Sequence, residues 1–285
     1  MRWEGRRQSE NVEDRRGVSA PAMVGGGLFA LLLMVGLMFL GVDPQQAMGI
    51  GRGLAPAPQP RSQNQKQPAN DTGARFIKTI LAENEDVWGK LFPQHFQGRY
   101  VPAKLVMFTK QVQSGCGVAS ASAGPFYCPL DKKVYIDLAF YDELKQRFGA
   151  PGEFAQAYVI AHEIGHHIQN QLGISNKVQA MRGRLSERDY NKLSVRMELQ
   201  ADFLAGVWAH YEARYAGILD EQDILDAVNA AAAIGDDKIQ KQAQGYVVPD
   251  AFTHGTSQQR QRWFLYGLKT GNPKLMDRAF EVDEP

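Results

Sequence analysis

Residues 151–173 read PGEFAQAYVIAHEIGHHIQNQLG and predict one long helix. A Pro-Gly-Glu sequence is suited to a helix start, and Leu172-Gly173 supplies a stop. Between these ends, apolar residues recur at the spacing of a helix that packs along one face. These residues are Phe154, Ala157, Tyr158, Ala161, Ile164 and Ile168.

The sequence His162-Glu163-Ile164-Gly165-His166 lies inside this predicted helix. Residues four apart on an α-helix lie on one face, one turn above each other, so His162 and His166 can direct two imidazoles at one metal ion. Glu163 lies about 100° around the helix from His162, where its carboxylate can act on a water at the metal without binding the metal. The pattern is the H-E-x-x-H signature of zinc peptidases. The alternative is a buried helix whose histidines are only core residues.

A second pair of acidic residues, Glu198 and Asp202, lies on a further predicted helix over residues 187–215. A catalytic zinc site takes three protein ligands, and Glu198 can supply the third. Asp202 lies one turn away on the same face. It can accept a hydrogen bond from the outer ring nitrogen of a ligand histidine and fix its tautomer. The alternative is a solvated acidic face. The apolar neighbours favour a buried site, and they are Leu199, Phe203, Leu204, Val207 and Trp208.

Four shorter stretches accompany the two motifs: Cys116-Gly117, Pro125-Phe126-Tyr127-Cys128-Pro129, Val134-Tyr135-Ile136-Asp137 and His254-Gly255-Thr256-Ser257. The two motifs together resemble the gluzincin arrangement of zinc peptidases. With the four stretches, the chain resembles the neutral zinc metallopeptidase family of bacterial membrane-anchored proteins, over about residues 75–280 and the hydrophobic N-terminus. The resemblance implies a zincin-like metallopeptidase domain, zinc as the cofactor, and a peptide or protein as the substrate.

His254 is a further candidate for the site, in the loop before a predicted helix at residues 257–269. A loop histidine near a metal can donate a hydrogen bond to the oxyanion of a tetrahedral intermediate, as a downstream histidine does in some gluzincins. The alternative is a surface or helix-capping residue. His167 points about 100° away from His166 and is expected to be structural. Arg260 is expected to pack or to face solvent.

The chain has two cysteines, Cys116 and Cys128, which are too few for a zinc ribbon. In an exported protein they would pair and close a loop of 13 residues. On the loop-entropy model, such a disulfide stabilises the fold by roughly 3 kcal/mol. The glycines and prolines around the cysteines indicate a loop and favour the disulfide over two free core thiols.

Residues 22–42 contain no charged side chain and are rich in Leu, Met, Phe and Gly. As a helix, this segment would span about 31 Å, which fits a hydrocarbon core of roughly 30 Å. Five arginines precede the segment, so the positive-inside rule predicts a cytoplasmic N-terminal segment over residues 1–21 and an exported C-terminal part. We therefore expect a single-pass protein of the bacterial inner membrane with its catalytic domain in the periplasm. A cleaved signal peptide is the alternative.

The rest of the chain divides into a linker and a domain. Residues 43–73 are rich in Pro, Gln, Gly, Asn and Ser and predict a flexible linker. Residues 74–285 predict one α+β domain, mainly helical with a small sheet. Besides the helices already named, we expect helices at residues 76–91, 140–148 and 220–234, and strands at residues 105–108, at residues 134–137 and around the cysteines.

An edge strand beside the active helix often holds the backbone of the substrate in zinc peptidases. The candidates for this strand are residues 134–137 and the segment bracketed by the two cysteines.

The predicted function is a membrane-anchored zinc peptidase. In this interpretation His162, His166 and Glu198 bind Zn²⁺, and Glu163 is the general base. Two other classes stay open: a zinc-binding scaffold or latent envelope protein, and a zinc hydrolase that cleaves a non-peptide amide bond with the same residues. A formal net charge of +1 argues against a nucleic-acid binder.

Overall fold

The computed structural model describes residues 1–17, 71–121, 124–146 and 149–282. Residues Met1–Arg16 and the residues from Asp71 onward form one unit. The predicted membrane helix at residues 22–42 lies outside the described residues, as does the predicted linker up to residue 70. Among the helices that are described, none has the length and apolar character needed to cross a membrane.

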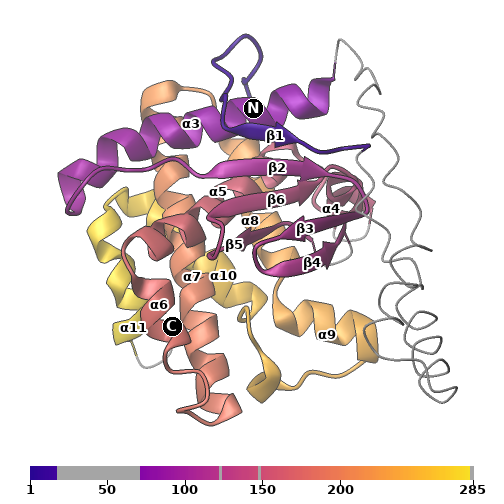
Figure 1. Cartoon of the computed structure of the whole chain (residues 1–285), viewed down its shortest axis with the longest axis vertical. Coiled ribbons are helices and arrows are strands. Elements are labelled where there is room, and N and C mark those ends of the chain that lie inside the picture. The colour runs from indigo at the N-terminus through magenta and orange to yellow at the C-terminus, as the bar shows by residue number, and fades with distance from the viewer. Residues whose placement is uncertain (18–70, 122–123, 147–148, 283–285) are drawn as a thin grey trace, which may run out of the picture. The chain divides into compact units, whose positions relative to one another are not determined.

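The main sheet has four strands, in the order β1 (Val12–Asp14), β2 (Lys104–Phe108), β6 (Lys133–Asp137) and β5 (Phe126–Cys128). Strands β1, β2 and β6 are parallel, and β5 runs antiparallel to β6 (Figure 1). Because β6 is paired on both sides, residues 134–137 are not a free edge, and that expectation is wrong. Val134, Tyr135 and Ile136 are all buried, as is usual in a central strand covered on both faces. Strand β5, between the cysteines, pairs on one side within the described sheet and is the remaining candidate.

A two-stranded hairpin, β3 (Gln111–Ser114) and β4 (Gly117–Ser120), accompanies the sheet. The turn of this hairpin carries Cys116, which forms the predicted disulfide with Cys128 at the end of β5. The disulfide therefore ties the hairpin to the edge strand of the main sheet. A small cluster of buried residues supports this connection and contains Val106, Phe108, Val112, Cys128 and Tyr135.

Within the described residues, most of the fold consists of five long helices: α3 (Thr72–His95), α5 (Glu153–Gln171), α7 (Glu187–Tyr211), α8 (Glu221–Ala233) and α10 (Ser257–Thr270). Helix α7 packs against both α5 and α10 (Figure 1). Glycines permit close approach at both contacts. A Cβ atom at Gly165 would lie 3.0 Å from the backbone of Ala201, and one at Gly206 would lie 2.0 Å from the carbonyl oxygen of Phe264. The expected α+β class, mainly helical with a small sheet, is confirmed.

Shorter elements connect these helices: α4 (Ala139–Gln146), α6 (Ile174–Gln179), the π-helical turn η2 (Glu212–Ala216), α9 (Asp236–Gln244), the 3₁₀ turns η3 (Pro249–Ala251) and η4 (Pro273–Asp277), and α11 (Arg278–Glu281). The helices predicted from apolar spacing all occur, with ends that differ by a few residues. Helix α9 escapes such a prediction because Asp236 is its one buried residue, so it has no periodic apolar face.

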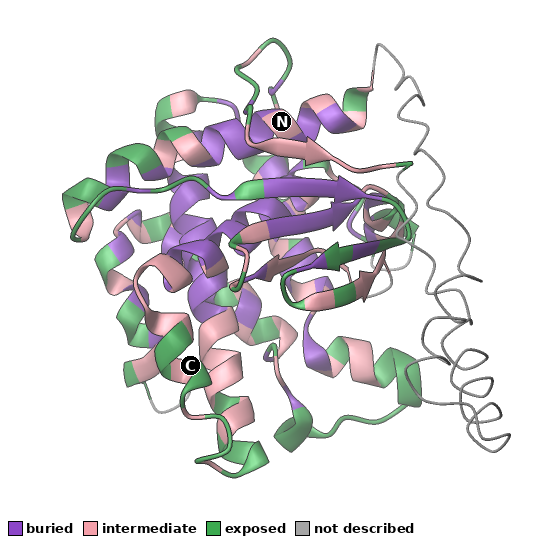
Figure 2. Cartoon of the chain, viewed as in Figure 1, coloured by how far each residue is buried: buried purple, intermediate pink, exposed green. Residues whose placement is uncertain are grey.

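Buried side chains follow the inner strands and the central helices (Figure 2). Phe154 on α5 stacks on Trp208 of α7, with ring centroids 5.6 Å apart. Burial of one such large apolar side chain stabilises a fold by about 2–3 kcal/mol. The helices that carry the candidate metal ligands are thus held together by the core itself.

The N-terminal residues are part of this domain. The ring of Trp3 is buried and lies edge-on to Phe76, with centroids 5.3 Å apart. The amino group of Met1 forms an ion pair with Asp223 at 2.7 Å. The predicted division set residues 1–21 apart from the folded domain, whereas residues 1–16 supply one of its strands and part of its core.

An ion pair joins the two ends of the segment that is not described. A guanidinium nitrogen of Arg16 lies 2.6 Å from a carboxylate oxygen of Asp71. The other oxygen of Asp71 accepts a hydrogen bond from the backbone N–H of Ala74 at 2.9 Å and caps helix α3. Residues 71–73, predicted to end the linker, therefore belong to the domain.

Candidate metal centre

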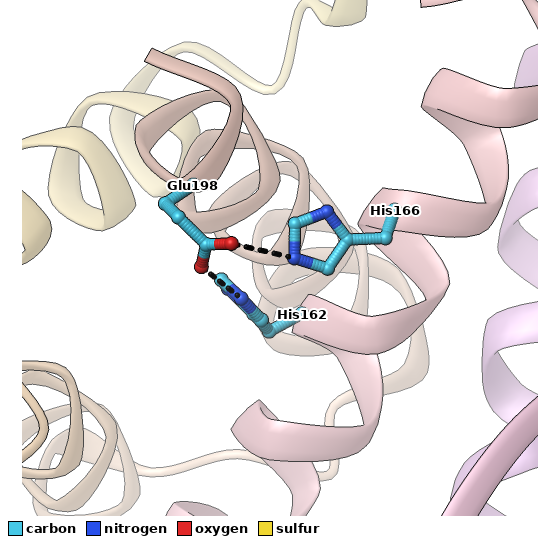
Figure 3. Close-up of side chains that lie close together, drawn as sticks. All are labelled: His162, His166 and Glu198. Carbon is cyan, nitrogen blue, oxygen red and sulfur yellow. Dashed lines mark hydrogen bonds and ion pairs between the residues drawn. The ribbon is translucent and has the colours of Figure 1, made fainter. Parts of the chain in front are cut away.

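Helix α5 carries the H-E-x-x-H sequence on its buried side. Its first turn contains Glu153, whose charge suits a helix N-terminus, and its middle is packed into the core. His162 and His166 lie one turn apart with ring centroids 4.8 Å from each other. Both rings point toward Glu198 of α7, the helix whose Ala201 backbone packs against Gly165 of α5 (Figure 3).

The Glu198 carboxylate lies between the two imidazoles (Figure 3). One of its oxygens is 3.1 Å from Nε2 of His162, and the other is 3.3 Å from Nε2 of His166. One ligand atom from each of these three residues lies within 4.8 Å of the others. Two imidazole nitrogens and one carboxylate oxygen are a donor set that catalytic zinc sites use, so the residues fit this metal.

Electrostatics favour the ionised form of Glu198. Burial by itself raises the pKa of the Glu198 carboxyl, but the charges and hydrogen bonds of His166 and His162 outweigh burial and hold this pKa well below its usual range. A carboxylate is the form that binds a metal.

The outer nitrogen of each histidine is held by a second side chain. Nδ1 of His162 lies 2.8 Å from Oδ1 of Asp202, and Nδ1 of His166 lies 2.8 Å from Oε1 of Gln169. If each Nδ1 carries the hydrogen and donates it, each Nε2 keeps its lone pair for a metal. Asp202 was predicted to hold the outer nitrogen of a ligand histidine. Gln169 was not, although it follows His166 by three residues on the same helix.

Gln169 is itself fixed from helix α7. Its amide nitrogen donates to the carbonyl oxygen of Met197 at 2.7 Å and to the side-chain oxygen of Gln200 at 3.0 Å. These bonds orient the amide so that its oxygen faces His166. No spacing rule connects residues 169 and 197, so only the fold reveals this contact.

Asp202 is fully buried and lies in a charged network with Arg260. Nε of Arg260 donates to Oδ2 of Asp202 at 2.8 Å, and the hydroxyl of Tyr158 donates to Oδ1. Burial alone raises the pKa of the Asp202 carboxyl, but the charge of Arg260, together with that of His162, outweighs it and lowers this pKa. Arg260 was expected to pack or to face solvent. It packs, and it also neutralises the carboxylate behind His162, a candidate metal ligand.

A cavity of about 480 Å³ opens beside these residues. Glu163 lines it together with His162, His166 and Glu198, although Glu163 is only 7% exposed. Its carboxylate therefore faces the cavity rather than bulk water. The cavity lining also includes Phe126 and Tyr127 of the edge strand β5 and Phe140 of α4.

His254 also lines this cavity, on the loop before α10, and is half exposed. Its Nδ1 lies 3.1 Å from Oδ1 of Asp236, the first residue of α9. The other oxygen of Asp236 accepts the backbone N–H groups of Thr253, His254 and Gly255 at 2.6–3.0 Å. Asp236 thus fixes both the loop at residues 253–255 and the imidazole of His254. No sequence pattern predicted this role for Asp236.

His167 points away from the candidate metal ligands. Its Nε2 lies 2.7 Å from the carbonyl oxygen of Val101, and its Nδ1 lies 3.0 Å from the hydroxyl of Tyr127. The ring is buried between these partners, so it connects α5 to neighbouring segments. This geometry is the structural one that was expected.

Comparison with known families matches residues 1–279 to the family described as "Putative neutral zinc metallopeptidase". The chain belongs to this family. This zinc metallopeptidase family member is similar to the protein named Uncharacterized protein YpfJ of Escherichia coli strain K12, with 48% identity over 283 residues and 96% of each chain covered. It is also similar to Uncharacterized protein Rv2575 of Mycobacterium tuberculosis strain H37Rv, with 40% identity over 266 residues and 86% of each chain covered. The comparison with solved structures found no match.

Membership of the zinc metallopeptidase family agrees with the chemistry of the site. The family suggests a zinc hydrolase, and His162, His166 and Glu198 form a donor set that can hold zinc. The family match includes residues 1–16, which the structure assigns to the domain.

Proposed function

We propose that this protein is a zinc-dependent peptidase. The observation that carries the proposal is the Glu198 carboxylate between the Nε2 atoms of His162 and His166, at 3.1 and 3.3 Å, beside a cavity that Glu163 lines. When bound by these three residues, zinc would supply a Lewis acid that polarises the scissile carbonyl and makes water more acidic.

Glu163 is the general base in this proposal. Its carboxylate accepts a proton from the attacking water and later returns that proton to the leaving amine, so the residue ends each cycle as it began. Its place on the cavity wall, one residue after a metal ligand, supports this assignment.

His254 stabilises the oxyanion in this proposal. Its hydrogen bond with Asp236 raises the pKa of the imidazole, although burial opposes the rise. The raised pKa favours the protonated ring. This ring can donate a hydrogen bond from Nε2, the nitrogen that is not bonded to Asp236. A preorganised donor of this kind contributes strongly to the stabilisation of developing negative charge.

Strand β5 holds the backbone of the substrate in this proposal. Phe126 and Tyr127 lie on the cavity wall, and β5 pairs with β6 on one side within the described sheet. An extended peptide can add to such an edge through main-chain hydrogen bonds, which recognise any sequence. Side chains of the cavity would then set the preference for particular residues.

We further propose that residues 22–42 attach the protein to the bacterial inner membrane with the domain outside the cytoplasm. The disulfide between Cys116 and Cys128 supports an oxidising compartment. The ion pair between Arg16 and Asp71 restricts where the N-terminal segment can lie relative to the membrane. One crossing by residues 22–42 would place about 30 Å of hydrocarbon between these two residues, whereas they lie 2.6 Å apart. The N-terminal segment is therefore proposed on the same side as the domain, in place of the cytoplasmic side.

The experiment that tests the function uses the full chain in detergent, because residues 1–16 belong to the fold. Casein, an unstructured protein, is the substrate, and a chelator followed by added zinc is the control. Cleavage that is lost on chelation and restored by zinc supports a peptidase. Bound zinc without cleavage of casein would contradict the proposal. It would favour a scaffold, or an amidase if a non-peptide amide is hydrolysed instead.

A further inference from the structure

A second cavity, of about 400 Å³, lies at the C-terminal end of helix α7. It shares no lining residue with the cavity at the metal centre. Its walls come from the N-terminal segment, from α3, and from the turn η2 that follows α7. Glu198 lines the first cavity and Glu212 the second, and their separation of fourteen positions corresponds to about 21 Å along a helix.

Glu212 is the unusual group in this second cavity. The residue is 1% exposed, yet its Oε2 atom has no hydrogen-bond partner among the described residues. A buried carboxyl oxygen without a partner is costly, so such atoms call for a specific explanation. Glu212 is also the first residue of a π-helical turn, a feature that is frequent at functional sites.

The neighbouring carboxylates are already paired with arginines, and Glu212 is not. Glu83 accepts two hydrogen bonds from Arg6, at 2.6 and 2.9 Å, and Asp86 is bound by Arg7 at 2.9 Å. Within the described part of the chain, no lysine or arginine nitrogen forms an ion pair with the Glu212 carboxyl. The Glu212 carboxyl therefore has no fixed cationic partner, and Lys90, which also lines the cavity, acts on it through its charge without an ion pair among the described residues.

An aromatic wall stands beside this carboxyl. Tyr211 and Tyr215 both line the cavity, with ring centroids 5.3 Å apart and ring planes inclined by 22°. Tyr215 is 75% exposed, which is unusual for a large aromatic residue. The faces of aromatic rings attract cations, particularly where a carboxylate lies close by.

We propose that this cavity binds the cationic end of a basic side chain, an alkylammonium or alkylguanidinium group, of a peptide or protein partner. The unpaired carboxyl of Glu212 receives the N–H donors, and the two tyrosine rings cover the alkyl portion and the charge. This proposal is independent of the peptidase activity, since it uses none of the residues of the metal centre.

Cation binding in this cavity should depend on pH through Glu212. Burial raises the pKa of the Glu212 carboxyl to about 8, with a further contribution from the charge of Glu83. A bound cation needs the ionised form, so affinity should rise about tenfold per pH unit below pH 8. The other charged groups that face Glu212 are Arg6 from the N-terminal segment and Glu83, Asp86 and Lys90 from α3.

The test uses the full chain in detergent and two small probes, 4,4,4-trifluorobutylammonium and the corresponding guanidinium, followed by fluorine NMR. The neutral alcohol 4,4,4-trifluorobutanol is the matched control. We expect both cations to bind and the alcohol not to bind, with affinity for the cations rising about fiftyfold from pH 6 to pH 8. The tighter of the two cations then distinguishes a lysine-like from an arginine-like partner.

Variants locate the binding site. Glu212→Gln should weaken cation binding at pH 8 by at least about tenfold and remove its pH dependence. Tyr215→Ala, at an exposed position that the fold does not need, should weaken it by about threefold. Tyr246→Ala changes an exposed tyrosine elsewhere and should have no effect. Equal binding of the alcohol, no binding of either cation, or full binding by both Glu212→Gln and Tyr215→Ala would overturn the proposal.

Discussion

Nδ1 of His162 lies 2.8 Å from Oδ1 of Asp202, and this contact joins the two helices that carry the candidate metal ligands. The imidazole is thereby oriented with its Nε2 toward Glu198. Because Asp202 is buried and its second oxygen accepts from Arg260, the carboxylate cannot easily turn away. The position of the first ligand thus depends on residues from three helices.

Replacing Asp202 by asparagine should weaken zinc binding. Asp202→Asn keeps the size of the side chain but removes the charge that fixes the tautomer of His162, so zinc affinity should fall by about 10–100-fold. Competition with a chelator of known affinity measures this change. Asp189→Asn, at an exposed position of the same helix, is the matched control and should leave the affinity unchanged. Equal zinc affinity in Asp202→Asn and wild type would show that the carboxylate does not orient the ligand.

Removing the imidazole of His254 should slow turnover and leave the metal in place. His254 lines the cavity but lies outside the three-ligand group. We expect His254→Ala to lower kcat by tenfold or more, because a preorganised donor to the oxyanion is lost. Zinc content by elemental mass spectrometry should stay at the wild-type value. The control is His95→Ala, at the C-terminal end of α3. A wild-type kcat in His254→Ala would contradict the proposed role of His254.

The pairing of Arg16 with Asp71 predicts that the N-terminus and the domain lie on the same side of a membrane. Single cysteines introduced at Glu4 and Lys241, both exposed, test this prediction in spheroplasts with a membrane-impermeant maleimide. Both positions should react in intact spheroplasts if the domain is exported. Reaction of the cysteine at position 241 alone would place the N-terminus in the cytoplasm and would contradict the packing of residues 1–16.

Glu212 should make the fold less stable as the pH rises. Its pKa is raised to about 8 by burial, whereas a carboxyl in the unfolded chain ionises near pH 4.3. Between these values the folded state binds more protons than the unfolded state. The contribution to stability is therefore complete below about pH 4 and is lost as the pH rises through 8.

Chemical denaturation from pH 6 to pH 9 measures this effect. Glu212→Gln should show a flatter pH profile than wild type and a higher relative stability at pH 9. Glu221→Gln, at an exposed position of α8, should follow the wild-type profile. Parallel profiles for Glu212→Gln and wild type would mean that Glu212 is ionised in the fold.

Much of the candidate site could be predicted from the sequence because its residues lie at helical spacing. His162 with His166, and Glu198 with Asp202, are each four apart, and a helix necessarily places such pairs on one face. The contact between the two helices depends on Gly165, whose importance is visible only when Ala201 is seen against it.

Other parts of the site could not be predicted because they depend on distant contacts. Arg260 is 58 residues from Asp202, and Asp236 is 18 residues from His254, with no periodicity that connects either pair. Gln169 required knowledge of which helix faces it. Arginines are rarely buried unless they form an ion pair. Arg260 therefore could not be distinguished from a surface arginine until its partner Asp202 was known.

The place of the N-terminal segment in the fold also could not be predicted from the sequence. Strand β1 has only three residues, Val12–Asp14, which is too short for an alternating pattern. Its partner β2 lies about 90 residues away, beyond the hydrophobic segment that dominates this part of the sequence. The positive-inside rule, applied to the arginines before residue 22, therefore predicted a cytoplasmic segment over residues 1–21 that is separate from the domain. Trp3 of this segment instead supplies a buried ring to the core.

The most direct test of the central claim compares zinc content and casein cleavage in wild type, Glu163→Gln and Glu143→Gln, all as full chains. Glu143 lines the same cavity as Glu163 and provides a matched loss of one carboxylate. We expect one zinc per chain in all three proteins, with cleavage by wild type and Glu143→Gln and none by Glu163→Gln. Cleavage that persists in Glu163→Gln would contradict the general base, and wild-type protein without zinc would contradict the metal centre.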